Sequence, residues 1–441
     1  MRRGADGLRR VLWFLLASWS PALAAGPMSV QDAIERAQAN SPALKTARAR
    51  VGGAKAAQGA VWEAYAPQVL IFGGVQRNEV GGSTTTTTST TPGLFGSTTT
   101  VSQHFSQSAT QGVLGASVEE FLFDFGTFSG QRTAAGERYG AQKEALATQS
   151  LDVELNVKVA YYTLLRANRF VRHQQELVDQ RRALLGAAAK NAAGEGKDAA
   201  QADLGLAEAR LALNKGENDL ADAELAFLDA IGEPGASTPP LVDDVTMKMI
   251  LVSPQQMVER ARSSRPELNQ AEAIVRAQQA EVDAARAGYF PRVASYFNVT
   301  SLNSIDNADL NRLTVLGGGL AVRVPTTWMV STDRLAQAEA GLQEAKARAE
   351  EIRQAITLAV ARSNAALSEA VERVRITNEL AENANRRWEE SQARSRRGLR
   401  ATADSRAAYA LVYDARIRLL QALYDAKIAE AKLERAIGFD F

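Results

Sequence analysis

The sequence predicts a mainly α-helical protein built from duplicated hairpins of long helices, with a small β part. Two observations favour long helices: Ala, Arg, Glu, Gln and Leu dominate long stretches of the 441 residues, and only 12 prolines interrupt them. The third observation is an internal repeat. Residues 30–67 and 254–291 align without a gap, and about a third of the aligned pairs are identical. One structural unit is therefore predicted to occur twice.

The composition excludes several classes of protein. The chain is 46% hydrophobic and 23% charged, with a formal net charge of +1. This is enough apolar material for a core, and it lacks the basic excess of a nucleic-acid-binding protein. The chain has no cysteine. Disulfides, thiolate metal sites, a cysteine nucleophile and a lipid-modified cysteine are therefore excluded.

Residues 1–25 are predicted to be a signal peptide. Four arginines precede a short apolar run at 11–18, and Ala22-Leu23-Ala24 has the small-x-small pattern of a cleavage site. The alternative, a membrane anchor, needs about 20 apolar residues, roughly twice the length of this run. The rest of the sequence predicts no transmembrane helix, so membrane contact would require an amphipathic helix or β-strands.

Each repeat is predicted to begin with one helix of about 35 residues, at 30–65 and at 254–289. Pro67 and Pro291 end these helices, because proline lacks the N–H donor and forces the preceding residue out of the α region. The predicted repeats cover 26–234 and 254–441, and the linker between them covers 235–253.

Two strand-like runs follow each of these helices. In the second run, Leu114, Ala116 and Val118 are expected to lie on one face and Val113, Gly115, Ser117 and Glu119 on the other. The Thr- and Ser-rich segment 78–111 is predicted to be a mobile loop, and Gly317-Gly318-Gly319 is expected to interrupt the fourth run. The four predicted runs are 69–75, 113–123, 293–299 and 313–324.

A very long helix and a return helix complete each repeat. The long helices are predicted at 131–190 and 331–397, and the return helices at 199–231 and 401–437. Sixty residues of α-helix make a rod of about 90 Å, which a compact domain of this size could not enclose. The spacing of small residues and Leu suits coiled-coil packing within each hairpin.

The role of the four strands is open on pattern alone. They could form a soluble four-stranded sheet. They could also cross a membrane, because strands of about 10 tilted residues span an outer membrane. Four strands cannot close a barrel, so the membrane interpretation requires several chains to share one.

The ordered set of elements resembles the TolC-type outer membrane efflux protein family. The resemblance covers nearly all of the chain after the signal peptide. It rests on the duplication, on the junctions Tyr65-Ala66-Pro67 and Tyr289-Phe290-Pro291, on Leu122-Phe123-Asp124-Phe125-Gly126, and on the segment 398–404 followed by Tyr413 and Ala415. The segment Val324-Pro325-Thr326-Thr327-Trp328 departs from the glycine-bearing pattern of the first half.

The resemblance implies a homotrimer in the outer membrane of a Gram-negative type of cell. Three protomers would form a trimeric α-barrel from their long-helix hairpins, and their four strands each would form a shared 12-stranded transmembrane β-barrel. The implied function is the exit duct of a tripartite export system for drug-like small molecules or secreted protein. The implied partners are a periplasmic adaptor, an inner-membrane pump and outer membrane lipid, with no nucleic acid and no cofactor.

The resemblance also implies a periplasmic entrance at the hairpin tips. Asp404 aligns with the first of two acidic residues that ring the entrance, while Ala407 occupies the second position. Arg400 aligns with a basic residue that pairs with an acid of the other hairpin, for which Asp203 is the candidate. The tips that would dock the adaptor are Gly194, Glu195, Gly196, Arg397, Gly398 and Leu399.

Enzyme functions find no support in the sequence. Asp124-Phe125-Gly126 has the letters of a kinase motif, but the other kinase motifs are missing. The two histidines, His104 and His173, have no paired ligands in the sequence. The chain is therefore expected not to be an enzyme. The remaining alternatives are a duct specifically for type I protein secretion and, in a different class, a periplasmic coiled-coil adaptor or structural protein.

Overall fold

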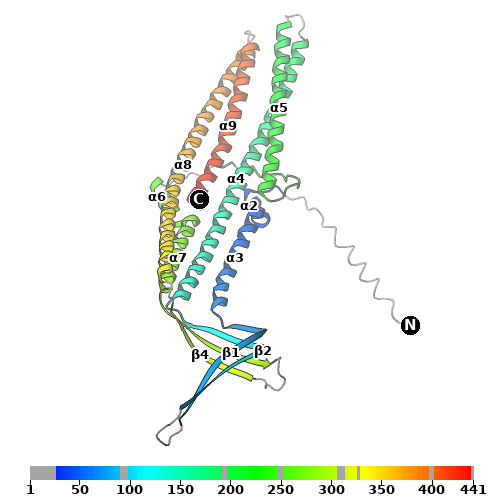
Figure 1. The fold of residues 1–441 in the computed structure, drawn as a ribbon. Coiled ribbons are helices and arrows are strands. Elements are labelled where there is room, and N and C mark those ends of the chain that lie inside the picture. Colours follow the sequence, from blue (N-terminus) through cyan, green and yellow to red (C-terminus); the bar gives the residue numbers. More distant parts are fainter. Residues whose placement is uncertain are drawn as a thin grey trace, which may run out of the picture. The chain divides into compact units, whose positions relative to one another are not determined.

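The computed structural model describes residues 26–89, 98–190, 196–243, 245–246, 253–304, 313–324, 328–396 and 402–438 (Figure 1). The predicted signal peptide lies outside these residues. The chain divides into two compact units. The helical unit comprises Met1–Val51, Gln142–Gln270 and Glu350–Phe441, and the sheet unit comprises Gly52–Ala141 and Ala271–Ala349.

The same order of elements occurs twice along the chain. It begins with two helices, continues with two strands and a very long helix, and ends with a return helix. The first set is α2 (Val30–Asn40), α3 (Pro42–Tyr65), β1 (Gln68–Ser89), β2 (Thr98–Phe123), α4 (Thr127–Lys190) and α5 (Gly196–Ala230). The second set is α6 (Pro254–Ser264), α7 (Pro266–Ala287), β3 (Arg292–Ser304), β4 (Leu313–Arg323), α8 (Trp328–Arg396) and α9 (Thr402–Ile437).

The single helix predicted at the start of each repeat is wrong, because each is broken into two. The breaks fall at Ser41 (φ −52°, ψ 122°) and at Arg265 (φ −76°, ψ 123°). Pro42 and Pro266 follow directly, and each restricts the residue before it to an extended conformation while starting the next helix at its first position. The repeated proline is therefore the first residue of a helix and not, as predicted, part of a helix interior.

The predicted mobile loop at 78–111 is also corrected. β1 and β2 pair as an antiparallel ladder from Gln68–Glu119 to Ser89–Thr98, which carries the Thr- and Ser-rich residues on both sides of the segment 90–97. Threonine is β-branched and fits a pleated ladder, so its low hydrophobicity does not prevent strand formation. β3 pairs with β2 only as far as Gln111–Ser304.

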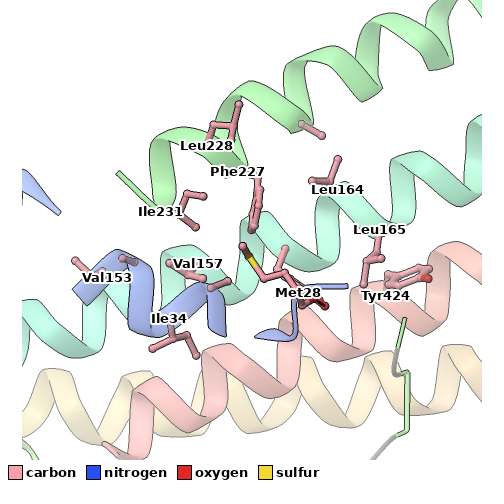
Figure 2. Close-up of a cluster of buried hydrophobic side chains, with 14 of the residues drawn as sticks. Met28, Ile34, Val153, Val157, Leu164, Leu165, Phe227, Leu228, Ile231 and Tyr424 are labelled. Atoms are coloured by element: carbon pink, nitrogen blue, oxygen red, sulfur yellow. Dashed lines mark hydrogen bonds between the residues drawn. The ribbon is translucent and has the colours of Figure 1, made fainter. Parts of the chain in front are cut away.

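The core of the helical unit lies where α2, α4, α5 and α9 meet (Figure 2). Phe227 of α5, Ile231 directly after α5 and Leu164 of α4 are fully buried there. Met28, in the segment before α2, forms a parallel bridge with Leu241. The Tyr161 hydroxyl lies within hydrogen-bond distance of the carbonyl oxygens of Met28 (2.9 Å) and Val242 (2.6 Å), so it joins the two strands of the bridge to α4.

Each hairpin has its own small apolar cluster toward its far end. In the first hairpin Val178 of α4 packs with Leu206 and Ala209 of α5. In the second, residues of α8 and α9 pack together, among them Ala381, Ala384, Val412 and Ala415. Small side chains at such contacts allow the two helices to approach closely, so the predicted helix-on-helix packing is present in both hairpins.

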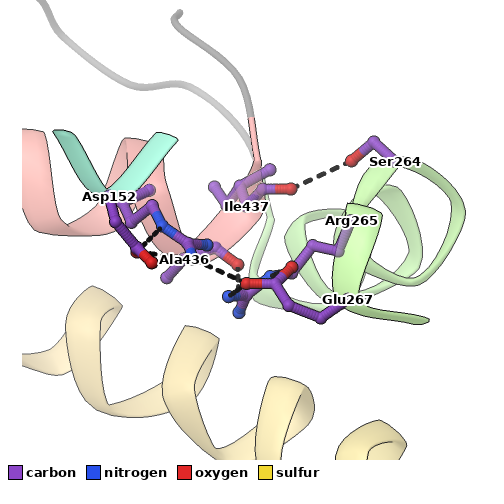
Figure 3. Close-up of polar contacts among 7 residues, drawn as sticks. Asp152, Ser264, Arg265, Glu267, Ala436 and Ile437 are labelled. Atoms are coloured by element: carbon purple, nitrogen blue, oxygen red, sulfur yellow. Dashed lines mark hydrogen bonds and ion pairs between the residues drawn. The ribbon is translucent and has the colours of Figure 1, made fainter. Parts of the chain in front are cut away.

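Arg435 of α9 joins three segments of the helical unit (Figure 3). It pairs with Asp152 of α4 at 2.7 Å and with Glu267 of α7 at 2.6 Å, and Arg265 pairs with the same Glu267 at 2.7 Å. Burial raises the pKa of Glu267, but the hydrogen bonds from Arg265 and Arg435 outweigh it, so the pKa of Glu267 is below its ordinary value. The carboxylate is therefore kept ionised.

Candidate functional site

The four strands form one antiparallel sheet in the order β1-β2-β3-β4. Directly paired residues point to the same face, so the register assigns every residue to a face. One such row is Ile71, Ala116, Val299 and Leu316, read across the four strands. The register also confirms that Leu114, Ala116 and Val118 share a face and that Ser117 and Glu119 lie on the other.

One face of the sheet, here called the apolar face, carries many aliphatic and aromatic side chains, together with polar ones such as Glu120, Ser295 and Ser301. Its side chains are largely exposed: Ile71 is 75% exposed, Leu316 68% and Leu320 69%. A contiguous exposed apolar surface of this kind marks contact with lipid or with another protein. The apolar residues of this face are Val69, Ile71, Val75, Leu114, Ala116, Val118, Val293, Phe297, Val299, Leu316, Leu320 and Val322.

The opposite face, here called the polar face, carries amides and hydroxyls among its apolar residues. Gln68, Ser117, Asn298 and Thr300 all belong to it. Polar side chains alternate with apolar ones along one strand, as in Val299-Thr300 and Ala116-Ser117. This alternation with a period of two is typical of a strand between lipid and water.

The three glycines Gly317, Gly318 and Gly319 do not interrupt β4, contrary to the expectation. They pair with Asn298, Phe297 and Tyr296 of β3, respectively. A Cβ atom added to Gly317 would lie in conflict with the side-chain oxygen of Asn298, and one added to Gly319 would lie 3.3 Å from the Tyr296 hydroxyl oxygen. The glycines therefore leave room for larger neighbours on the adjacent strand.

The turn from β2 into α4 is organised by Asp124, which the sequence analysis weighed only as part of a kinase-like motif. Its carboxylate accepts hydrogen bonds from the backbone N–H groups of Gly126 (3.2 Å) and Phe128 (2.6 Å), the second of which lies in the first turn of α4. A carboxylate here satisfies a free donor at the positive end of the helix. An aspartate three residues before a helix is the signal that could have identified it.

Aromatic side chains gather around this turn. Phe125 adopts a φ of 56°, unusual for a bulky residue, and its ring stacks on Phe290 with centroids 5.2 Å apart. A cavity of about 550 Å³ beside the turn is lined by Trp62, Tyr65 and Phe128, among others. Aromatic residues with an apolar body and a polar edge suit the end of a membrane-spanning sheet.

Two of the three predicted entrance residues, Asp404 and Asp203, belong to described helices. Asp404 belongs to the first turn of α9, and Asp203 is an exposed residue of α5. Arg400 lies outside the described residues, so an Arg400–Asp203 pair stays a prediction. Of the predicted docking tips, Gly196 is the first residue of α5. Gly194, Glu195, Arg397, Gly398 and Leu399 lie outside the part of the chain that the structure describes.

Two searches of the described residues bear on other kinds of site. They contain no group of three or more His, Asp or Glu side chains placed to hold a metal ion. Among the helices that the structure describes, none combines the length and the hydropathy needed to cross a membrane.

Comparisons with known proteins agree with this architecture. The sequence matches the profile of the outer membrane efflux protein family over residues 33–233 and 257–439. No match is found by sequence among functionally characterised proteins. The solved structures that resemble the fold and are described next share 17–19% sequence identity with this chain, so they show the fold alone.

Three of these structures illustrate the similarity, and each covers 93% of this chain. The MtrE outer membrane channel of Neisseria gonorrhoeae, in its open state, has a TM-score of 0.75 at 17% identity, with 89% of that chain covered. CusC has a TM-score of 0.73 at 19% identity, with 92% covered. The outer membrane protein VceC of Vibrio cholerae has a TM-score of 0.73 at 17% identity, with 96% covered. The predicted fold class, long-helix hairpins with four strands, is confirmed.

Proposed function

The chain belongs to the outer membrane efflux protein family, and from this premise we propose that three copies assemble into one continuous export duct. Each protomer contributes its four-stranded sheet to a common 12-stranded barrel in the outer membrane. Its two helix hairpins, α4–α5 and α8–α9, contribute to a helical tunnel in the periplasm. Drug-like small molecules or secreted protein pass from an inner-membrane pump through this duct to the outside.

The observation that carries the proposal is the chemical difference between the two faces of the sheet. The apolar face exposes Ile71, Leu316 and Leu320, while the polar face presents Ser117, Asn298 and Thr300. A sheet with one lipid-compatible face and one polar face fits the wall of a water-filled barrel. A soluble sheet would cover its apolar face with helices or with a second sheet.

The need for several copies follows from the strand count. β1 and β4 are the edges of the sheet and pair with one strand each in the described part of the chain. Strands at lipid depth cannot leave edge N–H and C=O groups unpaired. Four strands are too few to close a barrel around a passage, whereas 12 strands from three copies can do so. The preferred partner for each edge is therefore the opposite edge of another copy.

The ends of the hairpins are the proposed entrance and docking surface. The resemblance implies that three Asp404 carboxylates would converge on the axis, where they would favour cations. Arg400 would pair with Asp203 and hold the entrance shut, and the tips around Gly196 and Gly398 would bind the periplasmic adaptor. An exposed pair of this kind biases an equilibrium by about 1 kcal/mol, which is enough to change the fraction of open channels several-fold.

Membrane fractionation combined with crosslinking tests the assembly. The expected result is a heat-modifiable trimer in the outer membrane fraction. A soluble monomeric periplasmic protein would contradict the proposal and would favour the adaptor or structural alternative.

Single-channel recordings in planar bilayers test the entrance. Arg400→Ala is expected to raise conductance or open probability, and Asp404→Ala to reduce cation preference. Gly398→Trp is expected to abolish export while trimers and membrane insertion persist, because a bulky residue disturbs the docking tip. Wild-type conductance and selectivity of both the Arg400 and the Asp404 variant would show that the entrance lies elsewhere, and unchanged export by Gly398→Trp in cells would contradict the docking role of this tip.

A further inference from the structure

A charged pair lies on the polar face, away from the predicted entrance residues. Nη2 of Arg323 in β4 lies 2.6 Å from Oε1 of Glu119 in β2. The two residues belong to strands separated by β3, so Arg323 reaches across one strand to meet its partner. The intervening strand offers the small residue Ala294, which is 1% exposed.

The register places this pair at the rim of the sheet where the strands connect to helices. Glu119 pairs with Gln68, the first residue of β1. Arg323 is the last residue of β4 and pairs with Arg292, the first residue of β3. Both positions therefore lie at the boundary between the sheet and the helices α3, α4, α7 and α8 that continue from it.

Both side chains of the pair are partly exposed on the polar face, although Oε1 of Glu119, the atom that meets Arg323, is buried. The side chain of Arg323 is 60% exposed and that of Glu119 is 36% exposed. Glu119 shares its face with Ser117, while the next residue, Glu120, points to the apolar face. Charges in contact with hydrocarbon are costly, so an exposed ion pair belongs on the side of the sheet that faces water.

We propose that Glu119 and Arg323 line the lumen at the inner mouth of the barrel and contribute to the charge selectivity of the duct, in addition to the entrance at the hairpin tips. This inference rests on the proposed trimeric duct, in which three such pairs encircle the passage. Each pair is neutral while its partners are joined. Loss of one partner uncovers the charge of the other, and rings of uncompensated charge select the oppositely charged permeant.

The competing role is purely structural. In that case the pair would only tie β4 to β2, and an exposed pair contributes about 0–1 kcal/mol to such a link. The two roles predict different results. If the pair is only a structural link, removal of either partner weakens that link to the same extent. If the pair contributes to charge selectivity, removal of Arg323 and removal of Glu119 shift the selectivity in opposite directions.

The test measures reversal potentials of the full chain in planar bilayers under a salt gradient. Arg323→Gln is expected to shift the reversal potential toward cation selectivity, and Glu119→Gln toward anion selectivity. The double variant is expected to return close to wild type. Glu120→Gln, which removes the same charge one residue away on the apolar face, is the matched control and is expected to cause no shift.

A second variant separates charge from structure. Arg323→Lys keeps the charge but loses the planar guanidinium, and it is expected to keep the wild-type reversal potential. Conducting channels with unchanged reversal potentials in both Gln variants would overturn the inference, as would a shift in Arg323→Lys as large as that in Arg323→Gln. Failure of the wild-type chain to form any channel would instead overturn the proposed duct itself.

Discussion

The helical unit and the sheet unit differ in how much apolar core each builds within one chain. In the helical unit Phe227, Leu164 and Ile231 are 0% exposed and pack against residues of the same chain. In the sheet unit Ile71 is 75% exposed and Leu316 68% exposed. Burial of such a side chain contributes about 1.5–3 kcal/mol, so the sheet leaves much of its apolar area to be covered by something other than this chain. The helical unit builds a core within one chain, although it also exposes Leu204, Leu211 and Leu225, whereas the sheet unit leaves most of its large apolar side chains exposed.

The largest expected effect lies in the helical core. Phe227→Ala is expected to lower the free energy of unfolding by about 3–5 kcal/mol, because it leaves a cavity among α2, α4 and α5. Chemical denaturation of the full chain in detergent, followed by circular dichroism, measures the loss. Phe227→Leu is the control and is expected to cost about 1 kcal/mol, since it keeps most of the volume. Equal stability of the Ala variant and the wild type would mean that this cluster is not the core.

A charge placed on the apolar face tests whether this face of the sheet contacts lipid. Ile71→Arg is expected to impair insertion into lipid vesicles, with a cost of about 2–4 kcal/mol near the bilayer midplane and less toward the interface. Ser117→Arg places the same side chain on the polar face and is expected to leave insertion intact. Heat-modifiable migration of the reconstituted protein measures insertion. If both variants insert equally well, the apolar face does not contact lipid.

The ion pairs of Arg435 give a smaller, pH-dependent effect within the helical unit. Arg435→Gln is expected to cost about 2 kcal/mol, less than the 3–5 kcal/mol of a broken buried pair, because Arg265 still pairs with Glu267. The lowered pKa of Glu267 stabilises the fold above the ordinary pKa of a glutamate, and this contribution is lost as the pH falls through the lowered value. Denaturation curves of wild type and variant at several acidic pH values should therefore converge. Curves that stay separated by a constant amount would exclude this linkage.

The smallest effect concerns a glycine at the end of the first return helix. Gly232 has a φ of 73°, and a Cβ atom there would lie 3.1 Å from the backbone carbon of Asn40. Gly232→Ala is expected to cost about 1–2 kcal/mol, because an L-residue disfavours this conformation. Gly53→Ala in α3 is the matched control, since its Cβ atom would meet nothing within 4 Å. It is expected to stabilise the protein by about 0.5–1 kcal/mol in thermal unfolding. A reversed order would contradict the packing described for Gly232.

Much of the fold was predictable because its signals are local and repeated. The duplication, the long helices and the face assignment of Leu114, Ala116 and Val118 follow from periodicity within single segments. The helix breaks at Ser41 and Arg265 were not predicted, because the helical spacing of apolar residues continues across the proline that follows each break. The strand pairing within 78–111 was missed because the segment lacks apolar residues, and its pairing depends on the register with the partner strand.

The candidate site residues also divide into those that a local sequence signal could identify and those that depend on long-range contacts. Asp404 and Asp203 were assigned through a family resemblance, and their roles stay predictions. Asp124 could have been assigned from sequence as a helix cap, since it precedes α4. The pair of Glu119 and Arg323 could not, because 204 positions separate the two residues and only the register of three strands brings them together. Contacts across a sheet require this long-range pairing, which no local pattern encodes.

The central claim is that neighbouring residues of one strand face lipid and water in turn, and chemical labelling of single residues tests it most directly. The chain contains no cysteine, so single-cysteine variants carry one reactive thiol each. Two neighbouring pairs are suitable: Ala116→Cys with Ser117→Cys, and Val299→Cys with Thr300→Cys. In the reconstituted protein, a membrane-impermeant thiol reagent is expected to label the cysteines at 117 and 300 and to leave those at 116 and 299 unlabelled. Equal labelling of both members of each pair would contradict a sheet that separates lipid from a water-filled lumen.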